Sequence, residues 1–226
     1  MGDPAGIGPE VTVKSLNDPG IHKHCVPLVI GDIWTLNKEL EKHAPEKIIH
    51  PVQHASDCKS SSSVLNVLDL NMPECRKVKT GEVSAVAGHA AFMAVTKMID
   101  LALAGEIQAT VTGPIHKKAI NEAGYHFAGH TEIFANYTAT KDYAMLLVCD
   151  QLKVIHVTTH VSLRQACDQI DREGVLSRIR LLNLGLRKLG YKNPRIGVAG
   201  LNPHAGDEGL FGDDEIKSCL LYTSPS

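Results

Sequence analysis

Histidines in three short motifs are the side chains whose type and setting could carry chemistry in this sequence. The motifs are Gly129-His130-Thr131, Thr159-His160 and Asn202-Pro203-His204-Ala205-Gly206. The chain has 12 histidines in 226 residues, but these three lie in turns rich in Gly, Pro and Thr, where the backbone can present an imidazole to a ligand. A neutral imidazole can bind a divalent metal or contact a polar substrate group.

Two of these histidines follow predicted strands. His160 follows the strand predicted over Val154–Thr158, and His204 follows the strand predicted over Arg195–Gly200. Residues at the ends of strands in one sheet can converge in space. A catalytic metal takes about three protein ligands, and the sequence offers two good ones without an H-x-x-x-H or H-E-x-x-H pattern. Two interpretations therefore remain open: the two histidines share a metal site, or they are unrelated.

The third motif lies where a helix is predicted to begin. Thr131 could cap this helix or bind a ligand, and His130 could present its ring to a substrate hydroxyl or phosphate. Lys117 lies between a buried strand predicted over Ala109–Thr112 and a helix predicted over Lys117–Ala123, where a lysine can pair with a phosphate. A solvated loop histidine and an ordinary surface lysine are the alternatives.

A glycine-rich turn runs from Gly2 to Glu10 and leads into a helix. Its Gly6-Ile7-Gly8 segment is not the dinucleotide-binding fingerprint, because position 11 is Val and no strand precedes the turn. Its backbone amides could bind an anion at the helix N-terminus. A tight turn that needs a flexible backbone is an equally good interpretation.

These motifs are embedded in alternating strands and helices. Strands are predicted over 27–30, 64–70, 109–112, 144–149, 154–158 and 195–200, and helices over 11–16, 33–42, 80–104, 117–123, 172–189 and from 131 to before 142. The alternation predicts an α/β fold with a mainly parallel sheet and flanking helices. Residues 51–63 are polar and Ser-rich and are predicted to be a loop. We expect one region over 1–217, which two interleaved subdomains could form, and a tail over 218–226 that departs from the pattern.

Composition excludes several classes of function. The formal net charge is −2, which gives no electrostatic case for nucleic acid or an anionic membrane surface. No apolar run approaches the roughly 20 residues needed to cross a bilayer, and no signal peptide is visible. The six cysteines form no C-x-x-C pair, which is typical of reduced, mostly structural cysteines. We therefore expect a cytoplasmic protein.

As a set, the motifs resemble the 4-hydroxythreonine-4-phosphate dehydrogenase family of vitamin B6 biosynthesis. The segments that carry the resemblance come in family order and reach about residue 217: Gly2–Glu10, Thr112–Thr131, Thr158–His160 with Leu163-Arg164, and Leu201–Gly206 with Gly209–Gly212. The resemblance implies a fold similar to that of isocitrate and isopropylmalate dehydrogenases. It also implies a homodimer with the active site at the interface.

The resemblance implies NAD-dependent oxidation of 4-phosphohydroxy-L-threonine to 2-amino-3-oxo-4-(phosphooxy)butanoate, followed by decarboxylation. A divalent metal (Zn, Mg or Co) would assist. By match, His130 and Thr131 correspond to substrate-binding residues, and His130 is the candidate catalytic residue. His160 and His204 correspond to two of three metal-binding histidines, and Lys117 is the candidate phosphate contact. No NAD-binding residue is identified.

Departures from the family and rival functions are also part of the prediction. The first strand of the family and its C-terminal portion, with the third metal histidine, have no counterpart here, so we expect this chain to be inactive as a dehydrogenase. Within the family, Lys141–Met145 and Leu152–Val157 look more like enzymes that oxidise D-threonate or D-erythronate 4-phosphate. Rivals from other classes are a metal-dependent hydrolase or aldolase and a non-catalytic metal- or phosphate-binding module.

Overall fold

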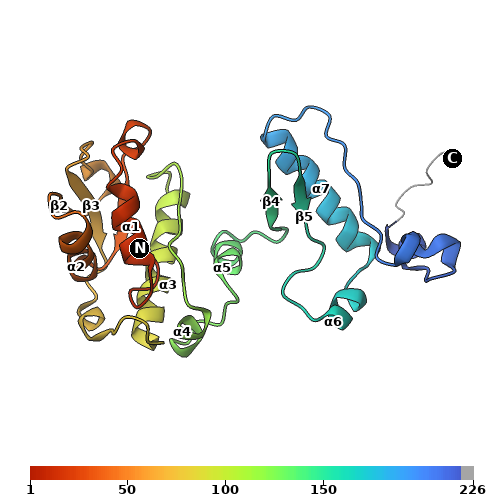
Figure 1. Cartoon of the computed structure of the whole chain (residues 1–226), viewed down its shortest axis with the longest axis horizontal. Coiled ribbons are helices and arrows are strands. Elements are labelled where there is room, and N and C mark those ends of the chain that lie inside the picture. The colour runs from red at the N-terminus through yellow and green to blue at the C-terminus, as the bar shows by residue number, and fades with distance from the viewer. Residues whose placement is uncertain (220–226) are drawn as a thin grey trace. The chain divides into compact units, whose positions relative to one another are not determined.

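A computed structural model describes residues 1–219, and the chain divides into two compact units, Met1–Thr140 and the part from Lys141 onward (Figure 1). The first unit has a three-stranded parallel sheet, and the second has a two-stranded antiparallel sheet. Helices flank the parallel sheet. The predicted α/β class with a mainly parallel sheet is therefore confirmed.

The parallel sheet of the first unit has the strand order β1-β3-β2. Its strands are β1 (Leu28–Gly31), β2 (Ile48–Val52) and β3 (Val64–Asp69). Parallel strands need a crossover connection, and α2 (Ile33–His43) lies in the one that joins β1 to β2, the two strands on either side of β3. The Asp32 side chain caps α2 by accepting a hydrogen bond from the Thr35 amide at 2.8 Å, so this helix begins where the sequence predicted.

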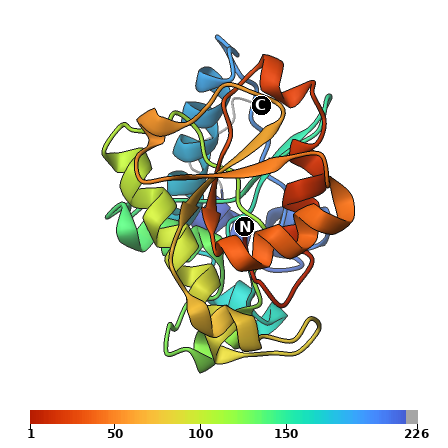
Figure 2. The same ribbon diagram turned by 90° about the vertical axis from the view of Figure 1, so that its left-hand side faces the viewer.

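Helices cover both faces of this sheet, because successive strand side chains point to opposite sides. Val29 of β1 packs in a cluster with α1 (Gly8–Leu16) and α2, whereas its neighbour Ile30 packs in a cluster with α3 (Ala85–Leu103). Figure 2 shows the sheet between these two helical layers. The α3 cluster also takes in Ile120 of α4 (Lys117–Glu122) and Ile133 of α5 (His130–Tyr137).

Helix α3 is the central helix of the first unit. Its 19 residues have a mean hydropathy of 1.4, which by length and composition alone would suffice to cross a membrane, and 61% of the stretch is buried inside the structure. That burial is what a core helix of a globular unit shows. The Ser84 side chain caps α3, so the helix begins later than the predicted position 80.

The second unit contains β4 (Leu146–Val148), β5 (Lys153–Ile155), α6 (Leu163–Asp168) and α7 (Arg172–Lys188). Its buried apolar side chains lie on one face of α7, at Val175, Leu182 and Leu186. Short helical turns complete both units at Ile21–Lys23, Ala55–Asp57, Pro73–Lys77, Pro203–Gly209 and Glu215–Cys219.

Three predictions of local structure were wrong. Ala109–Thr112 forms no strand, and Val111 is 93% exposed instead of buried. Residues 195–200 form no strand either. A strand needs a hydrogen-bonded neighbour, and no described strand pairs with these segments. The loop predicted over 51–63 begins too early, because Pro51 and Val52 belong to β2. This strand lies at a sheet edge, where proline is tolerated.

Candidate active site

The glycine-rich turn at the start of the chain lies against the Gly113 loop. The Asp3 amide donates a hydrogen bond to the Pro114 carbonyl at 2.9 Å. Gly2 has a φ of 77°, and a Cβ atom there would come within 2.8 Å of the Gly113 carbonyl carbon. A Cβ on Gly113 would come within 2.6 Å of the Met1 oxygen. The close approach of the two backbones therefore requires glycine at both positions, which favours the tight-turn interpretation.

The turn also carries the buried carboxyl group of Asp3. Asp3 was not among the predicted site residues. It is 6% exposed, and its Oδ1 accepts a hydrogen bond from the Ala5 amide at 2.7 Å. Burial raises the pKa of Asp3, whereas the Ala5 hydrogen bond and attraction to His116 lower it. A carboxyl group beside an imidazole can take part in proton transfer. The Gly-Asp-Pro turn and the histidine directly before Lys117 are the sequence signals that could have indicated this pair.

His116 also begins α4. Its Nδ1 accepts a hydrogen bond from the Ala119 amide at 3.3 Å, so the ring caps the helix. Lys117 is the first residue of α4 and is exposed. No carboxylate in the described part of the chain pairs with Lys117, and its Cε lies 3.9 Å from where a Cβ of Gly129 would stand. The lysine is therefore next to the turn that precedes His130, and it is available to an anion.

Among the predicted site residues that the structure describes, His130 has a buried ring atom that lacks a hydrogen-bond partner. Its Nε2 is buried and has no hydrogen-bond partner among the described residues. Burial lowers the pKa of His130, and a backbone hydrogen bond with Gly113 opposes this effect. Buried polar atoms are nearly always paired, so the Nε2 atom of His130 fits a contact with a ligand.

Thr131 lies in the first turn of α5, and its side chain is exposed. The prediction that it caps the helix was wrong, because Gly129 is the N-cap residue and no side chain caps α5. The Glu132 carboxylate instead accepts a hydrogen bond from the Ala128 amide at 2.7 Å. Among the described residues the Thr131 hydroxyl makes no hydrogen bond, and its ligand role stays a prediction.

The two predicted metal ligands lie in the second unit. His160 is exposed, has a φ of 57° and lies between β5 and α6. His204 is exposed, with its ring centroid 6.0 Å from that of Phe211. Among the residues that the structure describes, neither histidine belongs to a group of three metal-ligating side chains. Their role as metal ligands therefore stays a prediction.

The turn that carries His204 has an unusual backbone. His204, Ala205, Gly206, Asp207 and Glu208 all have φ between 45° and 85°, a region that costs most residues about 1–2 kcal/mol each. The buried Glu215 carboxylate holds the start of this turn, because it accepts hydrogen bonds from the Leu201 amide at 2.6 Å and the Asn202 amide at 2.5 Å. Strained backbone that surrounding contacts maintain is common at functional sites.

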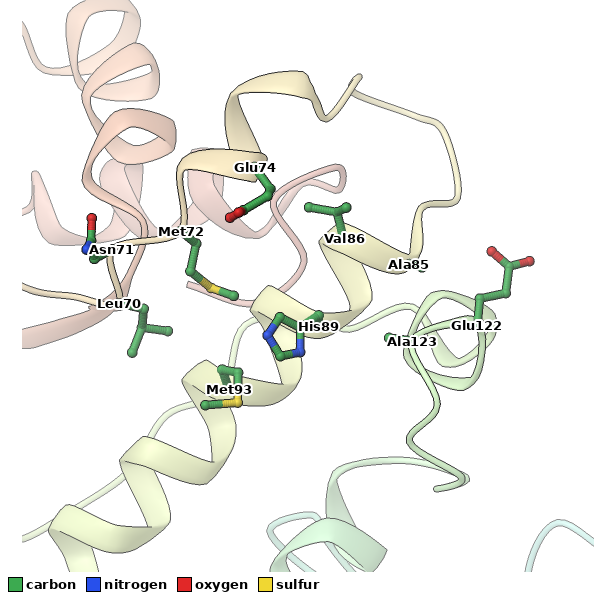
Figure 3. Close-up of a pocket in the computed structure, with 10 residues that line it drawn as sticks. All are labelled: Leu70, Asn71, Met72, Glu74, Ala85, Val86, His89, Met93, Glu122 and Ala123. Carbon is green, nitrogen blue, oxygen red and sulfur yellow. The ribbon is translucent and has the colours of Figure 1, made fainter.

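A pocket lies elsewhere in the first unit, between the start of α3 and the segment that follows β3 (Figure 3). Its volume is about 660 Å³. His89 lines it and shares a hydrogen bond of 2.6 Å with the Tyr125 hydroxyl. Glu74 and Glu122 are its charged lining residues, and no lysine or arginine lines it. A phosphate would meet only negative charge there, so this pocket does not compete with the His130 region for a phosphorylated substrate.

Comparison with known proteins decides the family. Residues 23–220 match the family described as "Pyridoxal phosphate biosynthetic protein PdxA". The chain belongs to this family. The resemblance inferred from its histidine and glycine motifs is confirmed.

Several relatives of this PdxA-family chain are named dehydrogenases. It is 41% identical over 218 residues to the D-threonate 4-phosphate dehydrogenase of Pectobacterium atrosepticum, covering 96% of this chain and 67% of the relative. It also matches the crystal structure of a 4-hydroxythreonine-4-phosphate dehydrogenase from Klebsiella pneumoniae with a TM-score of 0.87 and 42% identity, covering 97% of this chain and 66% of that one.

A more distant match is a terephthalate 1,2-cis-dihydrodiol dehydrogenase from Burkholderia xenovorans LB400, with a TM-score of 0.61 and 28% identity, covering 97% of this chain and 65% of the other. The chain thus spans about two-thirds of the length of the relatives it matches.

Proposed function

We propose that this PdxA-family chain serves NAD-dependent oxidation of a secondary alcohol in a 4-phosphorylated four-carbon hydroxy acid. The observation that carries the proposal is the buried Nε2 of His130, which has no hydrogen-bond partner among the described residues. The Lys117 side chain approaches Gly129, the residue directly before His130. The proposal also rests on the names of its relatives, which are dehydrogenases of such phosphates.

Lys117 would bind the phosphate as a flexible cation, and the Thr131 hydroxyl would donate a further hydrogen bond. His130 would contact the hydroxyl that is oxidised. Its Nε2 lone pair can accept the hydroxyl proton as the C–H hydride leaves, so one imidazole serves as both contact and general base. Burial keeps the ring neutral, which is the state that accepting a proton requires.

His160 and His204 would hold a divalent metal. Two exposed imidazoles with no hydrogen-bond partner among the described residues are suitable donors for Zn²⁺ or Co²⁺, whereas Mg²⁺ prefers oxygen ligands. When bound, such an ion supplies Lewis acidity at the substrate oxygen, and NAD supplies the hydride acceptor. Decarboxylation of the resulting 3-oxo acid, a homodimer and a cytoplasmic location belong to the same proposal.

Two substrates fit this proposal. The first is 4-phosphohydroxy-L-threonine, named in the solved relative, and the second is D-threonate 4-phosphate, named in the curated relatives. D-Erythronate 4-phosphate belongs with the second. The main difference is that the first substrate carries an amino group where the second carries a hydroxyl group. Because the curated relative reported above is a D-threonate 4-phosphate dehydrogenase, D-threonate 4-phosphate is the substrate to test first.

The test has a binding arm and a turnover arm. Calorimetry with D-threonate 4-phosphate is expected to detect binding that Lys117→Ala weakens at least tenfold, while Lys118→Ala, a neighbour paired with Glu122 at 3.7 Å, leaves it unchanged. Turnover is followed by NADH absorbance in a chain extended to the full length of its relatives. Phosphate release or aldol cleavage without NAD would instead identify a hydrolase or aldolase. Metal binding without any turnover would identify a binding module.

A further inference from the structure

A second group of metal-ligating side chains lies in the first unit, apart from the residues of the proposed active site. It consists of Glu10 on α1 with Glu39 and His43 on α2. One donor atom from each residue lies within 4.8 Å of the other two. His43 Nε2 is 3.5 Å from Glu39 Oε2. All three residues are half-buried, so they are more restrained than fully exposed surface groups.

Core packing holds the three donors in place. Glu39 and His43 are four residues apart, so they lie on one face of α2. Val13 of α1 packs in the same buried cluster as Leu36 and Leu40 of α2, which fixes α1 against α2 and brings Glu10 to the other two donors. A metal here would therefore meet ligands that are already in position, and little conformational entropy would be lost on binding.

Two lysines border the group without occupying it. Lys14 pairs with Glu10 Oε1 at 2.5 Å, and Lys42 pairs with Glu39 Oε1 at 2.6 Å. The lysine hydrogen bond and charge lower the pKa of Glu10, so this carboxylate is ionised at neutral pH. Each lysine contacts only one oxygen of its carboxylate. The second oxygen of Glu10 remains for another cation, whereas the second oxygen of Glu39 faces His43 Nε2 at 3.5 Å, a contact that a shared metal would replace. Exposed ion pairs such as the two lysine contacts resist displacement by at most about 1 kcal/mol.

A cavity of about 120 Å³ lies beside the two carboxylates of the group. Glu10, Glu39 and Trp34 line it, as do Lys38 and Lys42, whereas His43 does not. We propose that Glu10, Glu39 and His43 bind a divalent transition metal, with Zn²⁺ the best match. Imidazole favours Zn²⁺ over Mg²⁺ or Ca²⁺, and three protein ligands plus water complete its usual tetrahedral geometry.

Such an ion would link α1 to α2. Helix α1 begins at Gly8, directly after the turn that carries Asp3, so the link would stabilise the turn that lies against the Gly113 loop. This role differs from the metal proposed at His160 and His204, because it is structural and lies within the first unit. It does not depend on the proposed dehydrogenase activity.

Trp34 makes the test specific to this site. It is the only tryptophan of the chain and lines the same cavity, so Co²⁺ bound to the group is expected to quench its fluorescence. Quenching of the complete chain should saturate, reverse with EDTA and be prevented by prior addition of Zn²⁺. His43→Gln should weaken the effect at least tenfold, as should Glu39→Gln. His24→Gln, which replaces an exposed histidine outside the group, is the matched control and should leave it unchanged.

A second measurement separates loss of ligands from loss of fold. The circular dichroism spectrum and the melting temperature without metal should be the same for His43→Gln and the parent chain. Zn²⁺ should then raise the melting temperature of the His160→Ala/His204→Ala double variant but not of that variant carrying His43→Gln. Two results would overturn the proposal. One is equal quenching in His43→Gln and His24→Gln, and the other is no response of Trp34 to micromolar Co²⁺ and Zn²⁺. Either result would leave only an ion-pair network between α1 and α2.

Discussion

The contact between α3 and α4 is sensitive to a single added methyl group. Gly88 lies in the interior of α3, and a Cβ atom there would come within 2.6 Å of the Ile120 amide nitrogen and closer still to the Ala119 carbonyl. These are backbone atoms, so no side chain can rotate away. Carbon contacts are normally about 3.5–4.0 Å long, so Gly88→Ala requires α4 to move by about 1 Å.

The expected cost follows from two opposing effects. Replacing glycine by alanine inside a helix stabilises it by about 1 kcal/mol. Overpacking a core costs about 1–3 kcal/mol, and a clash with backbone belongs at the upper end of that range. We therefore expect Gly88→Ala to destabilise the first unit by about 2 kcal/mol. For a unit of this size that is a decrease in melting temperature of about 6–10 °C. Because α4 begins at Lys117, phosphate binding should weaken as well.

A matched substitution in the second unit controls for helix propensity. Gly185 also lies inside a helix, α7, but a Cβ there would stand 3.7 Å from the Leu146 Cδ2 atom, an ordinary contact. Gly185→Ala should therefore stabilise its unit by up to about 1 kcal/mol. Thermal and urea unfolding, monitored by circular dichroism, measure both variants. A Gly88→Ala chain as stable as the parent would refute the reasoning, because it would mean that α3 and α4 do not approach this closely.

Three further predictions concern single residues. Burial lowers the folded-state pKa of His130 below its ordinary 6.5. The stability that neutral His130 contributes is therefore present above pH 6.5 and is lost as the pH falls below 6.5 toward the folded-state pKa. An NMR titration should give His130 a pKa below 6.5, and His130→Gln should flatten this part of the stability profile. Hydrogen bonds from Asn202 and Leu201 lower the pKa of Glu215. The contribution of Glu215 to stability is therefore present above pH 4.5 and is lost as the pH falls below this value. Glu215→Gln should increase amide exchange in the His204 turn, and unchanged exchange would contradict this. Val111→Ser should change stability by less than about 0.5 kcal/mol because the side chain is exposed, whereas Ile120→Ala in the core should cost about 2–5 kcal/mol by urea unfolding.

The sequence by itself determined the features that depend on neighbouring residues. The helix predicted over 33–42 is α2 at Ile33–His43, because the Asp32 cap acts within three residues. The helix predicted over 172–189 is α7 at Arg172–Lys188, where Asp171 caps the first turn. The Gly-His-Thr motif also predicted the start of a helix, and α5 begins there at His130.

The tertiary structure decided everything that depends on distant partners. A strand exists only where another strand pairs with it, so the apolar run at 109–112 was misleading. The polar composition of residues 51–63 likewise concealed the end of β2, which pairing with β3 fixes. Asp3 and His116 are 113 positions apart, and only the backbone contact between Asp3 and Pro114 brings them together. The lack of a partner for His130 Nε2 among the described residues likewise results from burial, which no local pattern specifies.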